Sequence, residues 1–288
     1  MKVLITGAHG QVGRALVNSA PSTVHVLSRS RAELNITDRD VVRTCVAESR
    51  PDVIVNTAAY TAVDKAESEP KLAEQVNATG ARFLAEAASA AKARLIHIST
   101  DFVFDGTSST PYPVDAFANP LNVYGLTKRA GEEAVLAVHP EQSVILRTAW
   151  VYAAQGRNFL STILGRLRAG ASLRVVDDQI GTPTAARSVA QAIWKLIEAP
   201  AITGIHHWTD AGVASWYDFA VAIAEEAAAL GLAPREAQIT PIATRDYPTA
   251  ARRPAFSVLD KSALAGLGIT PVHWRQALRA VLQEMRNA

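Results

Sequence analysis

The first residues of the chain form the pattern that most constrains its fold: a short apolar run, a glycine turn and then a helical pattern. The run is Lys2-Val3-Leu4-Ile5, and glycine follows at positions 7, 10 and 13. Further strand candidates recur at 24–27, 53–55, 95–98 and 144–146, with helical patterns between them at about 11–20, 39–49, 71–93 and 122–138. Alternating short strands and helices predict a parallel sheet covered by helices on both faces. The predicted fold class is therefore α/β, with a doubly wound, Rossmann-type sheet.

The glycine turn indicates a site for a dinucleotide diphosphate. Gly7 would permit the tight turn, Gly10 would let the backbone approach the phosphates, and Gly13 would allow close packing of helix on strand. The amides that open the helix, near Gly10, Gln11 and Val12, would face the phosphate charge. The spacing is Gly-x-x-Gly-x-x-Gly rather than Gly-x-Gly-x-x-Gly, so a glycine turn that binds nothing stays an alternative.

The end of the second strand bears on the choice of cofactor. A carboxylate there suits the ribose 2′-hydroxyl of NAD, whereas an arginine suits the 2′-phosphate of NADP. This strand ends in Ser28-Arg29-Ser30-Arg31, with no carboxylate before Glu33. We therefore predict NADPH, contacted by Ser28 and Arg29, and leave NADH open as a second cofactor. A solvated basic turn is the other interpretation.

Composition excludes several classes of protein. With 49% hydrophobic and 19% charged residues, the 288-residue chain lies in the globular range. The net charge of +2 comes from scattered basic residues, so no nucleic-acid partner is expected. No leader is evident and no apolar run approaches the roughly 20 residues that cross a bilayer, so we expect a cytoplasmic protein. The single cysteine, Cys45, excludes an intrachain disulfide.

The second half of the chain follows a looser rhythm. After Trp150, glycine and proline interrupt shorter elements, and further helices are expected at about 185–199, 215–230 and 274–286. We predict a cofactor-binding domain at 1–150 that also includes a helix at about 183–203. A smaller, interleaved α/β substrate-binding region would comprise about 151–182 and 204–288.

Tyr124 and Lys128 are the clearest candidates for chemistry. Four residues apart on a helix, they share one face. A phenol has an ordinary pKa near 10, and a neighbouring ammonium lowers it, so that Tyr124 could exchange a proton with a hydroxyl or carbonyl group. The alternative is a surface helix with a half-buried tyrosine and a solvated lysine.

Two segments follow strands whose carboxyl ends would form the ligand-binding edge of the sheet. Ala58, Ala59, Tyr60 and Thr61 follow the third strand, where small side chains let the backbone approach a cofactor. Thr100 follows the fourth strand, and its hydroxyl could orient a reacting oxygen toward Tyr124; satisfying backbone groups at the strand end is the alternative. Together with the glycine turn, Thr100, Tyr124 and Lys128 favour an oxidoreductase.

Longer stretches carry a resemblance to a known family. They are 99–106 (Ser-Thr-Asp-Phe-Val-Phe-Asp-Gly), 119–125, 146–152, 175–183, 215–217 and 247–254. With these motifs the chain resembles, over essentially its whole length, the extended short-chain dehydrogenase/reductases that act on nucleotide sugars, and among them the dTDP-4-dehydrorhamnose reductases. The resemblance implies NADPH-dependent reduction of the 4-keto group of dTDP-4-dehydro-β-L-rhamnose to dTDP-L-rhamnose.

The resemblance also implies roles for single residues. Thr100, Tyr124 and Lys128 would be catalytic, with Lys128 also holding the nicotinamide ribose. Asn35 would contact the cofactor, and the substrate would meet Thr100, Asp101, Phe102, Trp150 and Arg253. The family pattern has Tyr and Asp where this chain has Phe102 and Asn35.

Several other functions are compatible with parts of this pattern. Related 4,6-dehydratases carry Asp-Glu after this threonine, but here Phe102 follows Asp101. A related epimerase, or a non-catalytic NADP-binding subunit like that of methionine adenosyltransferase, stays open. No metal is assigned: Asp177-Asp178 is interpreted as a turn, and Arg14-Ala15 replaces a glutamate that some family members use in a magnesium-dependent dimer contact. Monomer and homodimer are both left open.

Overall fold

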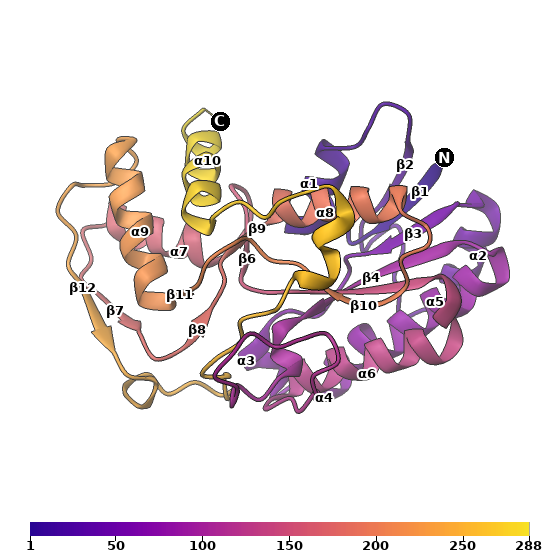
Figure 1. The fold of residues 1–288 in the computed structure, drawn as a ribbon, viewed down its shortest axis with the longest axis horizontal. Helices are drawn as coiled ribbons and strands as arrows, with labels where there is room; N and C mark the ends of the chain where they lie inside the picture. Colours follow the sequence, from indigo (N-terminus) through magenta and orange to yellow (C-terminus); the bar gives the residue numbers. More distant parts are fainter. Residues whose placement is uncertain (288) are drawn as a thin grey trace.

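The computed structural model describes residues 1–287 and contains a six-stranded parallel sheet (Figure 1). The strand order is β10-β5-β4-β3-β1-β2, so the chain winds outward from β1 in both directions. Each neighbouring pair of strands runs parallel. This confirms the predicted doubly wound sheet. Its strands are β1 (Lys2–Thr6), β2 (His25–Arg29), β3 (Val53–Asn56), β4 (Arg94–Thr100), β5 (Ser143–Thr148) and β10 (Gly204–His207).

Helices cover both faces of the sheet because apolar side chains point to both sides of its strands. On one face, Ile5 and its neighbours pack against α1 (Gln11–Asn18) and α8 (Ala186–Glu198). On the other face, Leu4 and its neighbours pack against α2 (Arg39–Ser49), α5 (Gly80–Ala91) and α6 (Val123–Val138). In Figure 1, α1 and α8 lie above the sheet and α5 and α6 below it.

The sixth strand was not expected from the sequence. β10 pairs with β5 from Gly204↔Val144 to His207↔Arg147, so residues 204–207 belong to the main sheet and not to the substrate-binding region. Two of its four residues are histidines, so the sequence lacks the apolar run that predicts a buried strand. His207 is nevertheless fully buried. The predicted boundary at 204 is therefore wrong by the length of this strand, and the division into two functional regions stays a proposal.

The predicted helix at 71–93 is interrupted. It comprises α4 (Pro70–Glu74), a π-helical turn (η1, Gln75–Thr79) and α5, and the short helix α3 (Val63–Ala66) precedes it. The turn lies against α6, where a Cβ on Gly131 would be only 2.1 Å from the Asn77 carbonyl oxygen. Asn77 is buried, and its side chain bonds the backbone N–H and C=O of Tyr60. The turn thus fixes the loop that follows β3.

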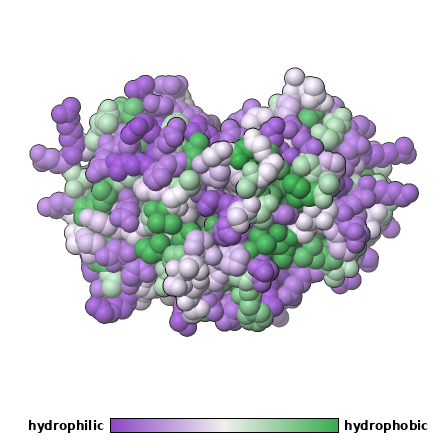
Figure 2. All heavy atoms as spheres, viewed as in Figure 1, coloured by the Kyte–Doolittle hydropathy of each residue, from purple (hydrophilic) through white to green (hydrophobic). Residues whose placement is uncertain are grey.

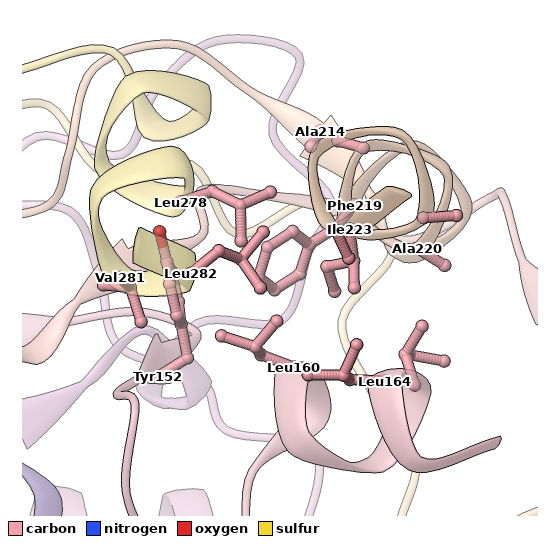
Figure 3. Packing of buried hydrophobic residues seen from close by; sticks show 14 of the residues in the cluster. Tyr152, Leu160, Leu164, Ala214, Phe219, Ala220, Ile223, Leu278, Val281 and Leu282 are labelled. Atoms are coloured by element: carbon pink, nitrogen blue, oxygen red, sulfur yellow. The ribbon is translucent and has the colours of Figure 1, made fainter. Parts of the chain in front are cut away.

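The second region is built from short two-stranded sheets and three helices. The helices α7 (Phe159–Arg168), α9 (Trp216–Ala229) and α10 (Trp274–Asn287) enclose a core centred on Phe219 and Leu282, into which Tyr152 extends (Figure 3). The strands are β6 (Val151–Tyr152), β7 (Leu173–Val176), β8 (Ile180–Gly181), β9 (Thr184–Ala185), β11 (Ala214–Ser215) and β12 (Ile239–Ile242). Short 3₁₀ turns are η2 (Asp101–Val103), η3 (Pro140–Gln142), η4 (Thr244–Asp246) and η5 (Ser262–Leu267). Figure 2 shows polar residues over most of one face, with hydrophobic residues gathered toward its middle.

Candidate active site

A cavity of about 660 Å³ lies between the carboxyl ends of β1, β4 and β5 and the second region. Open parallel sheets bind their ligands at this edge. Twelve of the residues predicted for the site line it. They are Gly10, Gln11, Val12, Ala59, Thr61, Thr100, Asp101, Phe102, Tyr124, Lys128, Trp150 and Arg253.

The glycine turn forms one end of the cavity and fits a diphosphate. Gly7 has a φ of +65°, which favours glycine, and a Cβ on Gly13 would be 2.4 Å from the Gly7 carbonyl oxygen. Gly10 precedes α1, whose first turn contains no acidic side chain. The Gly10 amide donates to the Gly7 carbonyl oxygen at 2.8 Å, so the predicted phosphate contact of this amide is not available in this conformation. The amides of Gln11 and Val12, together with the positive end of the helix dipole, suit phosphate oxygens. Gly7 and Gly13 shape the turn, while Gly10, Gln11 and Val12 face the cavity.

Side chains from the second region meet the same end of the cavity. Asn158 Nδ2 donates to Gln11 Oε1 at 2.8 Å, and Arg14 Nη1 donates to Gln155 Oε1 at 3.0 Å. Asn158 also caps α7 by accepting from the Ser161 amide. The loop before α7 is thereby fixed beside the glycine turn, which the sequence did not indicate.

The first turn of α6 places Tyr124 beside the end of β4. Asn122 caps the helix by accepting from the Gly125 amide at 2.8 Å. A Cβ on Gly125 would be 2.2 Å from the Phe102 carbonyl oxygen, so only glycine allows this approach. The Phe102 and Tyr124 rings meet edge to face with centroids 5.8 Å apart. Thr100 ends β4 on the same wall of the cavity.

The phenol of Tyr124 keeps its proton at neutral pH. Burial raises the pKa of Tyr124 to about 12; a hydrogen bond with Thr100 lowers this pKa, and the Asp101 charge raises it. Burial likewise raises the pKa of Asp101 to about 6. The prediction that Lys128 lowers the Tyr124 pKa is wrong in this structure, because desolvation dominates. A protonated phenol is the form that can donate a proton.

The amine of Lys128 is held by the neighbouring strand. Lys128 is 2% exposed, and its Nζ donates to the Ile98 carbonyl oxygen at 2.6 Å. Burial lowers the pKa of Lys128 to about 8, against the charge of Glu132 one turn further along α6. Glu132 itself forms a buried ion pair with Arg147, with a closest N–O distance of 2.6 Å.

Two stacked aromatic rings form another part of the cavity wall. Trp150 and Trp216 stack with centroids 3.5 Å apart and an interplanar angle of 3°. Trp150 has a φ of +48°, an unusual value for a bulky residue. Its ring packs directly on Gly181, because a Cβ added to Gly181 would be only 2.5 Å from Trp150 Cε2. Trp216 Nε1 donates to Gln179 Oε1 at 3.2 Å. These contacts hold a flat apolar surface at the edge of the cavity.

Arg253 reaches the cavity from the loop at 247–254. Its guanidinium pairs with Asp64, with Nη2 2.7 Å from Oδ2, and Nη1 also donates to Thr249 Oγ1 at 2.6 Å. Asp64 in turn accepts from the Ala251 amide at 3.1 Å. The arginine is therefore fixed in place beside α3.

Other predicted residues lie outside the cavity. Asn35 is exposed, and its side chain accepts from the amide and the hydroxyl of Thr37. Ser28 and Arg29 end β2, and Arg29 lines a separate surface groove together with Glu33. Ala58 and Tyr60 shape the loop after β3 without lining the cavity, and the Tyr60 hydroxyl donates to Glu69 at 2.7 Å.

Functional positions that the sequence did not reveal are mostly buried polar groups. Asn122 had a signal, since asparagine before a helical pattern predicts a cap. Asn77 and His97 had none, because their partners lie far away in the sequence. Within residues 1–287, no group of three or more His, Cys, Asp or Glu side chains is arranged to hold a metal ion. In the same described part of the chain, no helix is long and apolar enough to cross a membrane.

Comparison with known proteins places this geometry in context. The model of the family described as RmlD substrate binding domain matches residues 1–287. A dTDP-4-dehydrorhamnose reductase from Aggregatibacter actinomycetemcomitans is 40% identical, over 97% of this chain and 98% of its own. A dTDP-4-keto-6-deoxy-D-glucose reductase from Streptomyces niveus is 41% identical, over 96% and 94%. The crystal structure of a dTDP-4-dehydrorhamnose reductase from Bacillus anthracis in complex with NADP is 34% identical and has a TM-score of 0.92, covering 98% of this chain and 99% of that one.

Proposed function

Because this chain belongs to the RmlD substrate binding domain family, we propose that it is an NADPH-dependent reductase. The reaction is reduction of the 4-keto group of dTDP-4-dehydro-β-L-rhamnose to give dTDP-L-rhamnose. One observation carries the proposal most directly. The Tyr124 phenol, the Thr100 hydroxyl and the buried Lys128 line the same cavity as a helix end that suits a diphosphate.

At the cofactor end, the chain supplies charge and backbone donors. The amides of Gln11 and Val12 would bind the diphosphate, with Gly10 allowing its close approach, and Arg29 would pair with the 2′-phosphate after a change of side-chain conformation. Lys128 would bind the hydroxyls of the nicotinamide ribose. NADPH, when bound, supplies the hydride that is delivered to C4 of the sugar.

At the reacting carbonyl, Tyr124 and Thr100 act on the same oxygen. The Thr100 hydroxyl would donate to the C4 oxygen, where negative charge develops in the transition state. Tyr124 would transfer its proton to this oxygen as the hydride arrives at carbon, so that a neutral alcohol forms. A general acid of this kind contributes about 10²–10⁴-fold to the rate.

The second region supplies the surface for the sugar nucleotide. The stacked rings of Trp150 and Trp216 would pack against apolar parts of the substrate, and Arg253 would pair with its diphosphate. Family relatives at the same level of identity are named for different dTDP-linked 4-keto sugars. Selectivity among these sugars is therefore the part of the proposal that needs a direct test.

The test is NADPH consumption with freshly prepared dTDP-4-dehydro-L-rhamnose, with the product identified by NMR. dTDP-4-keto-6-deoxy-D-glucose serves as the competing substrate. We expect faster turnover with the rhamnose precursor and formation of dTDP-L-rhamnose. Preferred turnover of the glucose derivative would replace the proposed substrate, and no turnover with either sugar would refute the reductase assignment.

A binding experiment separates a reductase from a non-catalytic NADP-binding subunit. The NADP-loaded protein is titrated calorimetrically with dTDP-L-rhamnose, dTDP and UDP. A reductase should bind dTDP-L-rhamnose, because Trp150 and Arg253 line its site. A subunit that acts through protein contacts would keep NADP binding and show no heat with dTDP ligands.

A further inference from the structure

Behind Lys128, three buried polar side chains form a hydrogen-bonded chain to which the reaction above assigns no role. Thr6, Asn56 and His97 lie on the neighbouring strands β1, β3 and β4, and each is at most 1% exposed. Thr6 Oγ1 donates to Asn56 Oδ1 at 2.7 Å, and Asn56 Nδ2 lies 2.9 Å from His97 Nδ1. His97 Nε2 lies 3.4 Å from Lys128 Nζ. This chain of hydrogen bonds therefore ends at the Lys128 amine.

The backbone fixes the direction of this chain. The Ala58 amide donates to Asn56 Oδ1 at 3.2 Å, and a backbone N–H cannot act as an acceptor. The oxygen of the Asn56 amide must therefore face Ala58, and its nitrogen must face His97. Because an amide nitrogen only donates, His97 Nδ1 must accept and carries no proton.

The imidazole of His97 is neutral in this environment. Burial and the charge of Lys128 lower the pKa of His97 well below its ordinary value. A neutral imidazole that accepts at Nδ1 carries its proton on Nε2. The Nε2–H therefore faces Lys128 Nζ. An ammonium offers only donors to this N–H, whereas a neutral amine offers a lone pair.

We propose that the chain from Thr6 through Asn56 to His97 is a positioning element for Lys128: it presents an N–H to the amine and so favours its neutral form. The bond from Nζ to the Ile98 carbonyl oxygen is available to both forms of the amine. This inference rests on the proposed function and adds to it a second role for Lys128, the return of a proton to Tyr124 after the reduction.

Other charged groups near Lys128 act on it differently. Glu132 on the same helix favours the ammonium, but its carboxylate is already shared by Arg147 and Ser99. On the cavity side, burial keeps Tyr124 protonated at neutral pH, and the Asp101 charge raises the pKa of Tyr124 further. The Glu132 charge favours the ammonium form of Lys128, and the N–H that His97 presents from β4 opposes this effect.

The proton balance shows what such an element would do. After Tyr124 gives its proton to the C4 oxygen, the phenolate takes a proton from the Lys128 ammonium. The neutral amine that remains then takes a proton from solvent. An N–H that disfavours the ammonium makes the transfer to the phenolate easier, so His97 would speed the recovery of the general acid.

The tautomer can be measured directly in the wild-type chain. With ¹⁵N-labelled histidine, NMR distinguishes the two ring nitrogens, and loss of signals in His97→Leu assigns those of His97. We expect a protonated Nε2 and a bare Nδ1 at neutral pH. A proton on Nδ1, or a charged ring, would overturn the inference, and this result does not depend on whether any variant folds.

The effect on Lys128 is tested by its titration midpoint. The chain contains seven lysines, and in ¹³Cε-lysine spectra Lys128→Met assigns the signal. His97→Leu removes the N–H without adding charge, and we expect the Lys128 midpoint to rise by about one pH unit, the size of one hydrogen bond between neutral groups. If the ring only filled space, more apolar surroundings would lower the midpoint or leave it unchanged.

Two further variants test the direction of the chain. Asn56→Asp offers His97 only acceptors, so the ring should carry its proton on Nδ1 and accept from Lys128 at Nε2, and the Lys128 midpoint should rise. Thr6→Val is the matched control, because the Ala58 amide still orients Asn56, and the midpoint should stay at its wild-type value. A shift in Thr6→Val equal to that in Asn56→Asp would contradict the mechanism.

The turnover profile links the inference to the reaction. The alkaline limb of turnover should move in the same direction as the Lys128 midpoint in His97→Leu and Asn56→Asp. The NMR experiments need no substrate. If the protein had no reductase activity, the proposed function would be refuted, but the measured tautomer of His97 would still hold. The opposite tautomer in an active enzyme would refute only this inference.

Discussion

Replacement of Gly125 by alanine tests whether the position of Tyr124 limits the reaction. The added Cβ would lie 2.2 Å from the Phe102 carbonyl oxygen and 2.9 Å from Pro120 Cβ, whereas Cβ atoms keep at least 3.0 Å from other heavy atoms. The first turn of α6 must therefore move away from the end of β4 by about 1 Å, and a displacement of this size at a reacting group costs about 10²-fold in rate. We expect a loss of turnover of this order, with an overpacking cost of about 1–3 kcal/mol in stability.

The assay compares turnover, NADPH affinity and thermal unfolding of Gly125→Ala with those of the wild type. NADPH affinity should change little, because an added Cβ on Gly125 meets only Phe102 and Pro120 and neither the glycine turn nor Arg29. Gly165→Ala is the matched control: Gly165 lies within α7 with no atom within 4 Å of an added Cβ. This control should gain about 0.4–1 kcal/mol in stability and keep its turnover. Wild-type turnover in folded Gly125→Ala would refute the argument that this close approach positions Tyr124.

Four other substitutions have expected outcomes. Tyr124→Phe should lower turnover by at least about 10²-fold, with Tyr217→Phe as a control that keeps it; equal turnover in both would remove Tyr124 from proton transfer. Lys128→Met should lose turnover yet unfold at a higher temperature than the wild type at neutral pH. Burial lowers the folded-state pKa of Lys128 to about 8 from 10.5, so the unfolded chain binds more protons between these values, and wild-type stability should rise with pH across that window; calorimetry at several pH values checks the sign. Arg29→Ala should weaken NADPH binding by about 1.5–3 kcal/mol and NADH binding less, as cofactor titrations would show. Arg253→Ala should weaken dTDP-L-rhamnose binding without changing NADP binding, and unchanged titration heats would place Arg253 outside the substrate site.

The sequence predicted those parts of the fold that local patterns determine. Short apolar runs such as Val3 to Ile5 predict strands correctly, because strands buried on both faces consist almost entirely of hydrophobic residues. Glycine spacing identified the turn after β1 for two reasons. Gly7 has a positive φ that favours glycine, and at Gly13 the Gly7 carbonyl oxygen lies too close for any side chain. Tyr124 and Lys128 could be paired in advance because they lie four residues apart on one helix, and Thr100 could be added because it ends a strand at the ligand-binding edge of the sheet.

Features that depend on distant partners could not be read in this way. The strand β10 has only four residues, two of them histidines, and it becomes a strand by pairing with β5. The pKa of Tyr124 was expected to fall because Lys128 is four residues away, but burial of the phenol decides the direction. The contact between Asn56 and His97 joins strands that are 41 residues apart in sequence. No single-sequence pattern reports such a pair.

The late position of α8 and β10 along the chain has a consequence for synthesis on the ribosome. When residues 1–150 have emerged, β5 has an open edge, and one face of the sheet, around Ile5, lacks its cover from α8. An unpaired strand edge beside exposed apolar surface favours aggregation. The six-stranded sheet can therefore be completed only after His207, the last residue of β10, has left the exit tunnel. A fragment that ends near residue 150 should need a chaperone to stay in solution.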